Sequence, residues 1–301
     1  MMRLPVFYCD HHEIPLPAGH KFPLRKYRML REILERDPRF ELAPAGPAAP
    51  EDVMLAHDPD YVRRFVEGTL PPAAMRRIGF PWSEGLVRRT LASAGGSLSA
   101  AEQALQRGFG GTLGGGTHHA FAAEGAGFCV FNDVAIAVRH LRARGRARRF
   151  AVVDLDVHQG DGTAHFFEHD PEVFTLSIHG KDNFPFRKQR SRLDVELEDG
   201  TRDEAYLAAL EAVLPCVWEF RPELVFYLSG VDALKEDRLG RLALSLEGMK
   251  ARDERVIGGA RDRGLPLVIT LGGGYAEPIE RTVEAHANTF RIAAGLYGPA
   301  D

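Results

Sequence analysis

The segment from Asp154 to Gly162 carries three carboxylates and an imidazole directly after the apolar run 150–153. Because side chains alternate along a strand, Asp154, Asp156 and His158 would project to one side if the strand continued through them. Asp156 and His158 could then grip one divalent cation. A buried cluster of this kind would be very costly without a metal or another charge partner. The segment therefore predicts a metal site at the end of a strand.

Three further segments combine glycines with polar side chains, at 114–119, 229–232 and 272–275. The first ends in the imidazoles of His118 and His119. The other two follow apolar runs directly and end in the carboxylate of Asp232 and the phenol of Tyr275. In open parallel α/β sheets, ligands bind at the carboxyl ends of the strands. We therefore expect these segments to converge on one crevice.

The donors that would meet in this crevice suit a catalytic metal, which needs about three protein ligands and an open position for water. Asp156, His158 and Asp232 supply carboxylate oxygens and one ring nitrogen, without the thiolates of a structural zinc site. This set is compatible with Zn²⁺ or Fe²⁺. Such a metal acidifies water and polarises a substrate carbonyl.

The remaining polar side chains suit proton transfer. His118 and His119 are apt for acid–base work, and Asp154 and Asp161 are their expected partners, which would fix each tautomer and raise each pKa. Tyr275 could donate its phenolic hydrogen to a developing oxyanion.

Each segment taken alone has a structural alternative. A histidine pair is more often structural or on the surface, an acidic residue after a strand is often a helix N-cap, and the glycines at 272–274 could form only a turn. The joint occurrence of these features at predicted strand ends favours a functional site.

The elements that would position these residues alternate between strand and helix, which predicts an α/β fold with a mainly parallel sheet flanked by helices in three layers. We expect one domain spanning residues 1–301. Short apolar runs predict strands at Leu4–Tyr8, Ala151–Leu155, Val173–Ile178, Leu224–Leu228 and Leu267–Leu271. Helical periodicity predicts helices at Glu84–Leu105, Phe131–Arg144, Asp203–Glu219, Leu246–Arg263 and Ile279–Leu296.

Composition narrows the classes of partner. The net charge of -4 provides no overall basic field, so direct nucleic-acid binding and an anionic membrane are not expected. The basic run 142–149 is interpreted as a solvated turn. Three dispersed cysteines indicate no disulfide framework, which fits a reducing cytoplasm. Residues 1–9 are too short for a signal peptide, and no apolar stretch reaches membrane-spanning length.

In its motifs the chain resembles the histone deacetylase superfamily of metal-dependent deacylases. This group also includes acetoin-utilisation proteins and acetylpolyamine amidohydrolases. The matching motifs span nearly the whole chain, at 115–120, 127–133, 154–162, 229–232 and 271–275. Gln159 and the segments 195–201 and 237–240 are most similar to the class IV branch and its bacterial relatives.

The resemblance implies metal coordination by Asp156, His158 and Asp232. It implies that His119 is the general base and acid, with His118 as its electrostatic partner and Tyr275 as the donor to the carbonyl. Asp154 and Asp161 match the family's supporting carboxylates. For binding the acyl substrate, the resemblance implies a tunnel lined by Phe128, Phe184 or Phe186, Leu239 and Gly273.

Members of the family often bind monovalent cations, so the resemblance also implies K⁺ or Na⁺. The positions that match one such site are Asp154, Asp156, His158, Ser177 and Ile178. Those that match a second site are Phe167, Asp170 and Val173.

Two positions depart from better-known branches. Class I members grip a peptide backbone with a loop carboxylate, and the corresponding stretch 78–82 has none. Polyamine-specific members place a glutamate where this chain has Leu239. The favoured function is hydrolysis of an acyl-lysine-like amide, and a small amide or polyamine is the alternative substrate.

Two other functions are consistent with the same scaffold. An arginase-like ureohydrolase would need bridging carboxylates at the positions of Gly160 and Leu234, so a single metal is favoured. A non-catalytic protein that binds an acyl ligand remains the alternative outside enzymes. The sequence leaves the oligomeric state open.

Overall fold

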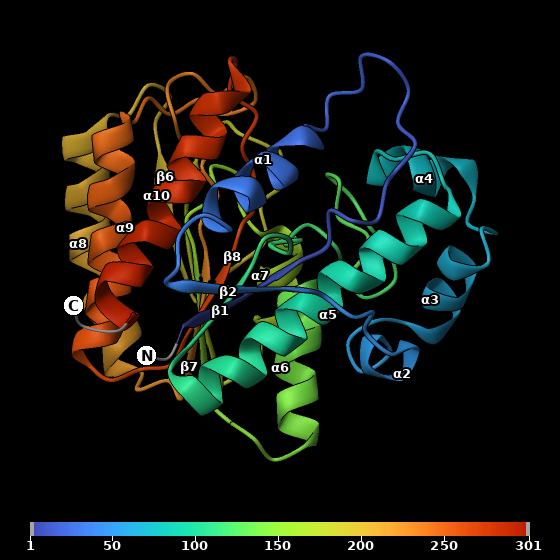
Figure 1. Ribbon diagram of the computed structural model, residues 1–301, viewed down its shortest axis with the longest axis horizontal. Helices are drawn as coiled ribbons and strands as arrows, with labels where there is room; N and C mark the ends of the chain where they lie inside the picture. The colour runs from blue at the N-terminus through green and yellow to red at the C-terminus, as the bar shows by residue number, and fades with distance from the viewer. Residues whose placement is uncertain (1–2, 299–301) are drawn as a thin grey trace.

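The protein is built on one eight-stranded sheet, seen nearly edge-on in the computed structural model, which describes residues 3–298 (Figure 1). All paired strands run parallel, in the order β2-β1-β3-β8-β7-β4-β5-β6. Their bounds are β1 (Leu4–Tyr8), β2 (Phe40–Pro44), β3 (Phe109–Thr112), β4 (Phe150–Asp154), β5 (Val173–Gly180), β6 (Leu193–Leu197), β7 (Leu224–Leu228) and β8 (Leu267–Thr270).

Helices cover both faces of this sheet, so the predicted three-layer α/β fold is confirmed. In Figure 1, α8, α9 and α10 lie to the left of the sheet, and α5 and α6 lie to its right. The bounds are α1 (Arg25–Leu34), α2 (Pro50–Val53), α3 (Pro59–Val66), α4 (Pro72–Ile78), α5 (Glu84–Arg107), α6 (Asp133–Ala143), α7 (Asp161–Phe167), α8 (Asp203–Glu219), α9 (Leu246–Asp262) and α10 (Ile279–Tyr297). None of the helices within residues 3–298 is long and apolar enough to cross a membrane.

The apolar runs of the central strands feed two separate cores, one on each face. In β4, Ala151 and Val153 pack into the core formed with α1, α8, α9 and α10, whereas Phe150 and Val152 pack into the core formed with α3, α5 and α6. A strand buried on both faces carries no polar alternation. This explains why β4 and β7 are continuous apolar runs.

The structure contains all five predicted strands and all five predicted helices, with ends shifted by at most two residues. Three strands were not predicted. β3 has the sequence Phe-Gly-Gly-Thr, and its glycines are required because a Cβ at Gly110 would collide with the backbone of Ala100 in α5. β2 and β6 are edge strands with mixed exposure, where the apolar signal is weak.

The strand order explains how distant segments come together. The four polar and glycine-rich segments follow β3, β8, β7 and β4, which are consecutive neighbours in the sheet. Because these strands are parallel, their carboxyl ends share one edge. The expected convergence on one crevice is therefore confirmed.

Candidate active site

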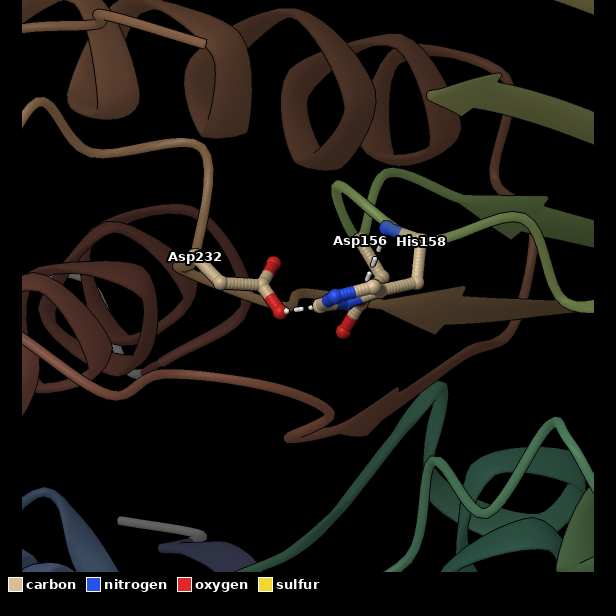
Figure 2. Close-up of side chains that lie close together, drawn as sticks. All are labelled: Asp156, His158 and Asp232. Carbon is tan, nitrogen blue, oxygen red and sulfur yellow. Dashed lines mark hydrogen bonds and ion pairs between the residues drawn. The ribbon is translucent and has the colours of Figure 1, made fainter. Parts of the chain in front are cut away.

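Three side chains at this edge form a cluster suited to a metal ion. One ligand atom from each of Asp156, His158 and Asp232 lies within 4.8 Å of the others. His158 Nδ1 lies 3.0 Å from Asp156 Oδ1 and 3.1 Å from Asp232 Oδ2. Figure 2 shows how the three side chains come together. The three residues predicted as metal ligands thus meet at one point.

The local backbone differs from the simple strand expectation. β4 ends at Asp154, so Asp156 and His158 lie on the loop that follows it and not on a continued strand. Backbone N–H groups hold this loop: Asp156 N donates to Asp154 Oδ1 at 3.1 Å, and Val157 N donates to Asp232 Oδ1 at 2.9 Å. The carboxylates of Asp154 and Asp232 therefore set the position of the loop.

The donor set fits a divalent cation. Asp156 and Asp232 are fully buried next to each other, and burial together with the charge of Asp156 raises the pKa of Asp232 to about 7. Adjacent buried carboxylates need a compensating positive charge. Oxygen and nitrogen donors without sulfur suit Zn²⁺ or Fe²⁺. The three residues could therefore hold a divalent metal ion, as the sequence predicts.

Glycine makes room for these carboxylates. Gly273 N donates to Asp156 Oδ2 at 2.6 Å, and a Cβ at Gly273 would collide with the carboxylate of Asp232. The glycine run therefore does more than form a turn, because it lets the backbone approach the acidic cluster closely.

The two histidines carry the predicted carboxylate partners. His118 Nδ1 lies 2.7 Å from Asp154 Oδ2, and His119 Nδ1 lies 2.7 Å from Asp161 Oδ1. Both imidazoles are buried, with ring centroids 4.1 Å apart. Both residues line a cavity at this edge of the sheet.

The pKa values of the two imidazoles move in opposite directions. Burial acts to lower the pKa of His118, but the charges of Asp154 and Asp156 outweigh it and raise that pKa to about 9. For His119 the expected rise is wrong: burial and the neighbouring charge of His118 outweigh Asp161 and lower its pKa to about 4. His119 is consequently a neutral imidazole beside a charged one, near neutral pH.

Tyr275 is held by residues that sequence reasoning did not single out as functional. Its backbone N–H donates to Asp237 Oδ2 at 2.6 Å. Lys26 Nζ donates to the carbonyl of Gly272 at 3.1 Å and lies 5.5 Å from the Tyr275 ring centroid. The sequence offered one indication for Asp237, because it begins the segment 237–240 that is similar to the class IV branch. Lys26 had none, because a lysine in the basic stretch 25–31 is normally solvated.

A cavity of about 530 Å³ joins these groups to the surface. Its lining includes His118, His119, Asp156, His158 and Tyr275. All the predicted tunnel residues line it as well: Phe128, Phe184, Phe186, Leu239 and Gly273. Of the two candidates for the wall opposite Phe128, Phe184 packs edge-on against His119 at 4.9 Å, whereas Phe186 is 86% exposed.

The residues matched to monovalent cation sites fall in two places. Asp154 and Ser177 are register partners on β4 and β5, and Asp154 directly precedes the loop that carries Asp156 and His158, so these members of the first set lie close together. In the second set, the Asp170 carboxylate is paired with Arg142. A cation there would have to rely on backbone carbonyls.

Comparison with known proteins identifies the family to which the chain is similar. The family model for the histone deacetylase domain matches residues 20–290. The chain is 44% identical to an uncharacterized protein of Picosynechococcus, over 98% of this chain and the whole of that protein. It is 31% identical to the histone deacetylase-like amidohydrolase of Pseudomonas aeruginosa, over 87% of this chain and 74% of that one.

A solved structure shares the fold. The crystal structure of the HDA15 HD domain superposes with a TM-score of 0.81 at 21% identity, and the match covers 97% of this chain and 91% of that one. Together, the parallel sheet and its buried carboxylate–histidine cluster define an α/β protein of the arginase/deacetylase fold. The chain belongs to the histone deacetylase family.

Proposed function

We propose that this protein is a Zn²⁺-dependent amidohydrolase that removes an acyl group, acetyl or longer, from an amide such as acyl-lysine. The observation that carries the proposal is the meeting of Asp156, His158 and Asp232 at a cavity that His119 and Tyr275 also line. Residues 1–301 would act as one catalytic domain in the cytoplasm, with K⁺ or Na⁺ beside Asp154 supporting the loop.

The cavity orders the reacting groups. The lysine stem lies against the aromatic wall of Phe128 and Phe184, which excludes water. A divalent cation held by the three ligands would acidify a water molecule and polarise the acyl carbonyl. Tyr275 donates its phenolic hydrogen to the oxyanion that develops on that carbonyl.

His119 moves the proton. The neutral imidazole accepts a proton from the attacking water, while Asp161 on Nδ1 fixes the tautomer and stabilises the imidazolium that forms. The same nitrogen then returns the proton to the leaving amine. His118, charged and paired with Asp154, sets the local field and keeps His119 neutral before attack.

A turnover assay tests the proposal directly. Zinc-reconstituted protein is expected to hydrolyse acyl-lysine peptides, measured by release of the free amine. Binding of an acyl-lysine peptide without any amine release would instead support the non-catalytic acyl-binding alternative.

One observation favours a small amide as a second candidate substrate. The segment 78–82 contributes Ile78, Gly79 and Phe80 to the cavity but no carboxylate that could accept a peptide N–H. Hydrolysis of free small amides or acetylpolyamines faster than lysine peptides in the same assay would favour this candidate.

The metal assignment makes a prediction about Asp232. Asp232→Ala is expected to lower zinc occupancy at matched zinc concentration by about ten-fold or more, because even supporting residues of metal sites typically contribute ten- to hundred-fold in affinity. Elemental analysis of the dialysed protein measures this. The matched control is Asp199→Ala, whose carboxylate is at the surface and pairs with Arg241. Full occupancy in Asp232→Ala would refute the assignment.

A further inference from the structure

Arg89 is a buried cation on the wall of the active-site cavity, and no acidic side chain in the described part of the chain pairs with it. Arg89 is only 7% exposed, and its Nη1 donates to the backbone carbonyls of Cys9 at 3.2 Å and His12 at 3.3 Å. Within residues 3–298, no carboxylate lies at ion-pair distance from its guanidinium, and no hydrogen bond engages its Nε or Nη2. The guanidinium also lies over the ring of Tyr27, 4.6 Å from the centroid.

The contrast with the other buried arginine is informative. Arg252 pairs with Asp253 at 2.8 Å, as expected for a guanidinium out of water. A buried charge without such a partner is costly, and guanidinium forks bind carboxylates in particular. Backbone carbonyls and a ring face offset part of this cost for Arg89, but they leave donors free on the side of the cavity. An anionic ligand would complete the site.

Arg89 belongs to the inner end of the cavity. At the mouth, Phe184 and Phe186 are 36% and 86% exposed, whereas Cys9 and Leu86 at the inner end are 2% and 1% exposed. Leu86, Arg89 and Ser93 follow the i, i+3, i+7 spacing of one helical face, and this face of α5 forms part of the cavity wall. Arg89 therefore belongs to the buried part of the cavity, whereas Phe184 and Phe186 of the aromatic tunnel belong to its exposed part.

A short glycine floor connects this inner end to the metal-type cluster. A Cβ at Gly114 would lie 3.1 Å from Cys9 Sγ, and a Cβ at Gly116 would lie 2.6 Å from the backbone nitrogen of Gly272. Gly272 in turn lies against Asp156, because its own Cβ would be 3.0 Å from Oδ2. Gly114 and Gly116 are two residues apart, at most ~7 Å, so the floor between Cys9 and the cluster is short, and acyl chains of about four to six carbons are the range to test.

Besides Asp156, the carboxylate of Asp133 approaches this floor, and its charge is already compensated. Asp133 accepts hydrogen bonds from Ser97 Oγ at 2.5 Å, Gly116 N at 3.1 Å, and the backbone and hydroxyl of Thr117 at 2.8 and 2.6 Å. These donors stabilise its charge and leave the guanidinium of Arg89 to an incoming anion.

We propose that Arg89 binds the distal carboxylate of a dicarboxylic acyl group, so that the enzyme prefers succinyl-, glutaryl- or adipoyl-type amides to uncharged acyl groups. The inference rests on the proposed amide hydrolysis and names its acyl substrate. An acyl carbonyl at the metal-type cluster directs the rest of the acyl chain away from the mouth and toward Arg89. Hydrolysis breaks the amide C–N bond, forms a C–O bond to the water oxygen, and releases the amine with the transferred proton and the free dicarboxylate.

Matched acyl pairs test the preference. Succinyl-, glutaryl- and adipoyl-lysine peptides are compared with butyryl-, pentanoyl- and hexanoyl-lysine peptides, which have the same number of carbons but no carboxylate. For wild-type enzyme, kcat/KM is expected to favour the charged member of at least one pair. In Arg89→Met that ratio is expected to fall by about ten- to hundred-fold, the typical loss of a charge-assisted hydrogen bond.

Arg88→Met is the matched control, because Arg88 is on the same helix but exposed and paired with Glu84. Its ratio is expected to equal that of wild type. Arg89→Lys keeps the charge in case the methionine variant does not fold, and it is expected to retain part of the preference. A wild-type ratio at or below one in all three pairs would overturn the inference, as would a ratio that a folded Arg89 variant leaves unchanged.

A binding measurement separates this inference from the proposed function. Free glutarate is titrated by calorimetry into metal-loaded wild-type, Arg88→Met and Arg89→Met proteins. Glutarate binding that Arg89→Met weakens and Arg88→Met does not supports the carboxylate site even if no peptide is hydrolysed. Equal glutarate binding by all three proteins, or none, would overturn it, whereas turnover of uncharged acyl-lysine would leave the proposed hydrolysis intact.

Discussion

Replacing Tyr275 with phenylalanine is expected to lower kcat by about 10²- to 10³-fold while leaving the fold and the metal content unchanged, because the substitution removes only the phenolic hydrogen-bond donor. The ring would stay in place. The backbone N–H of Tyr275 donates to Asp237, and the ring lies near Phe128 and Lys26. None of these contacts involves the hydroxyl group.

The loss of rate is expected in kcat, because the oxyanion that Tyr275 stabilises exists only after attack on the carbonyl. Burial raises the pKa of Tyr275 well above its usual value, so the phenol keeps its proton at the pH of the assay. Tyr297→Phe is the matched control: its hydroxyl donates to the carbonyl of Leu265, away from the cavity. Steady-state kinetics with metal content measured on each variant would check this. Unchanged kcat in Tyr275→Phe would remove the residue from the mechanism.

The central sheet and the cluster at its edge could be predicted because both depend on local patterns. A strand buried on two faces must be apolar throughout, as in β4 and β7. Carboxylates that follow such a strand stand out, and the edge rule for parallel sheets places Asp156 near Asp232 without any knowledge of the strand order. The position of the metal-type cluster therefore follows from sequence spacing.

The details that depend on packing between distant segments could not be predicted. Arg89 and Lys26 sit on helices among other basic residues, and nothing in their neighbourhood in the sequence distinguishes a buried cation from a solvated one. The predicted direction of the pKa shift of His119 was wrong for a related reason. A carboxylate partner raises the pKa of an imidazole, but full burial beside a second, charged imidazole lowers it more. That balance exists only in the folded protein.

The same balance underlies the comparison of the two histidines. His119→Ala is expected to lower kcat by about 10²- to 10⁴-fold with little change in substrate binding, because a positioned acid–base group contributes that much to the rate. His118→Ala is expected to be less damaging. His119 is the imidazole kept neutral by its surroundings, and a neutral imidazole can accept the proton of the attacking water.

The assignment also follows from what each side chain contacts. The ring centroid of His119 lies 4.9 Å from that of the tunnel residue Phe184 and 6.0 Å from that of His158, so His119 adjoins both the tunnel and the metal-type cluster. The charges of Asp154 and Asp156 raise the pKa of His118 to about 9, so we expect its imidazole to hold a proton near neutral pH and to act mainly on the field around His119.

Two further variants serve as controls for the comparison of His119 and His118. Asp161→Asn leaves His119 in place but removes the charge that stabilises its imidazolium, so it is expected to lower kcat less than His119→Ala does. His118→Asn avoids leaving a cavity beside Asp154. Kinetics on all four variants, with zinc content checked, would decide the roles. A His119→Ala enzyme with near-wild-type kcat, or a His118 variant that loses more activity than it, would reverse the assignment and make His118 the proton carrier.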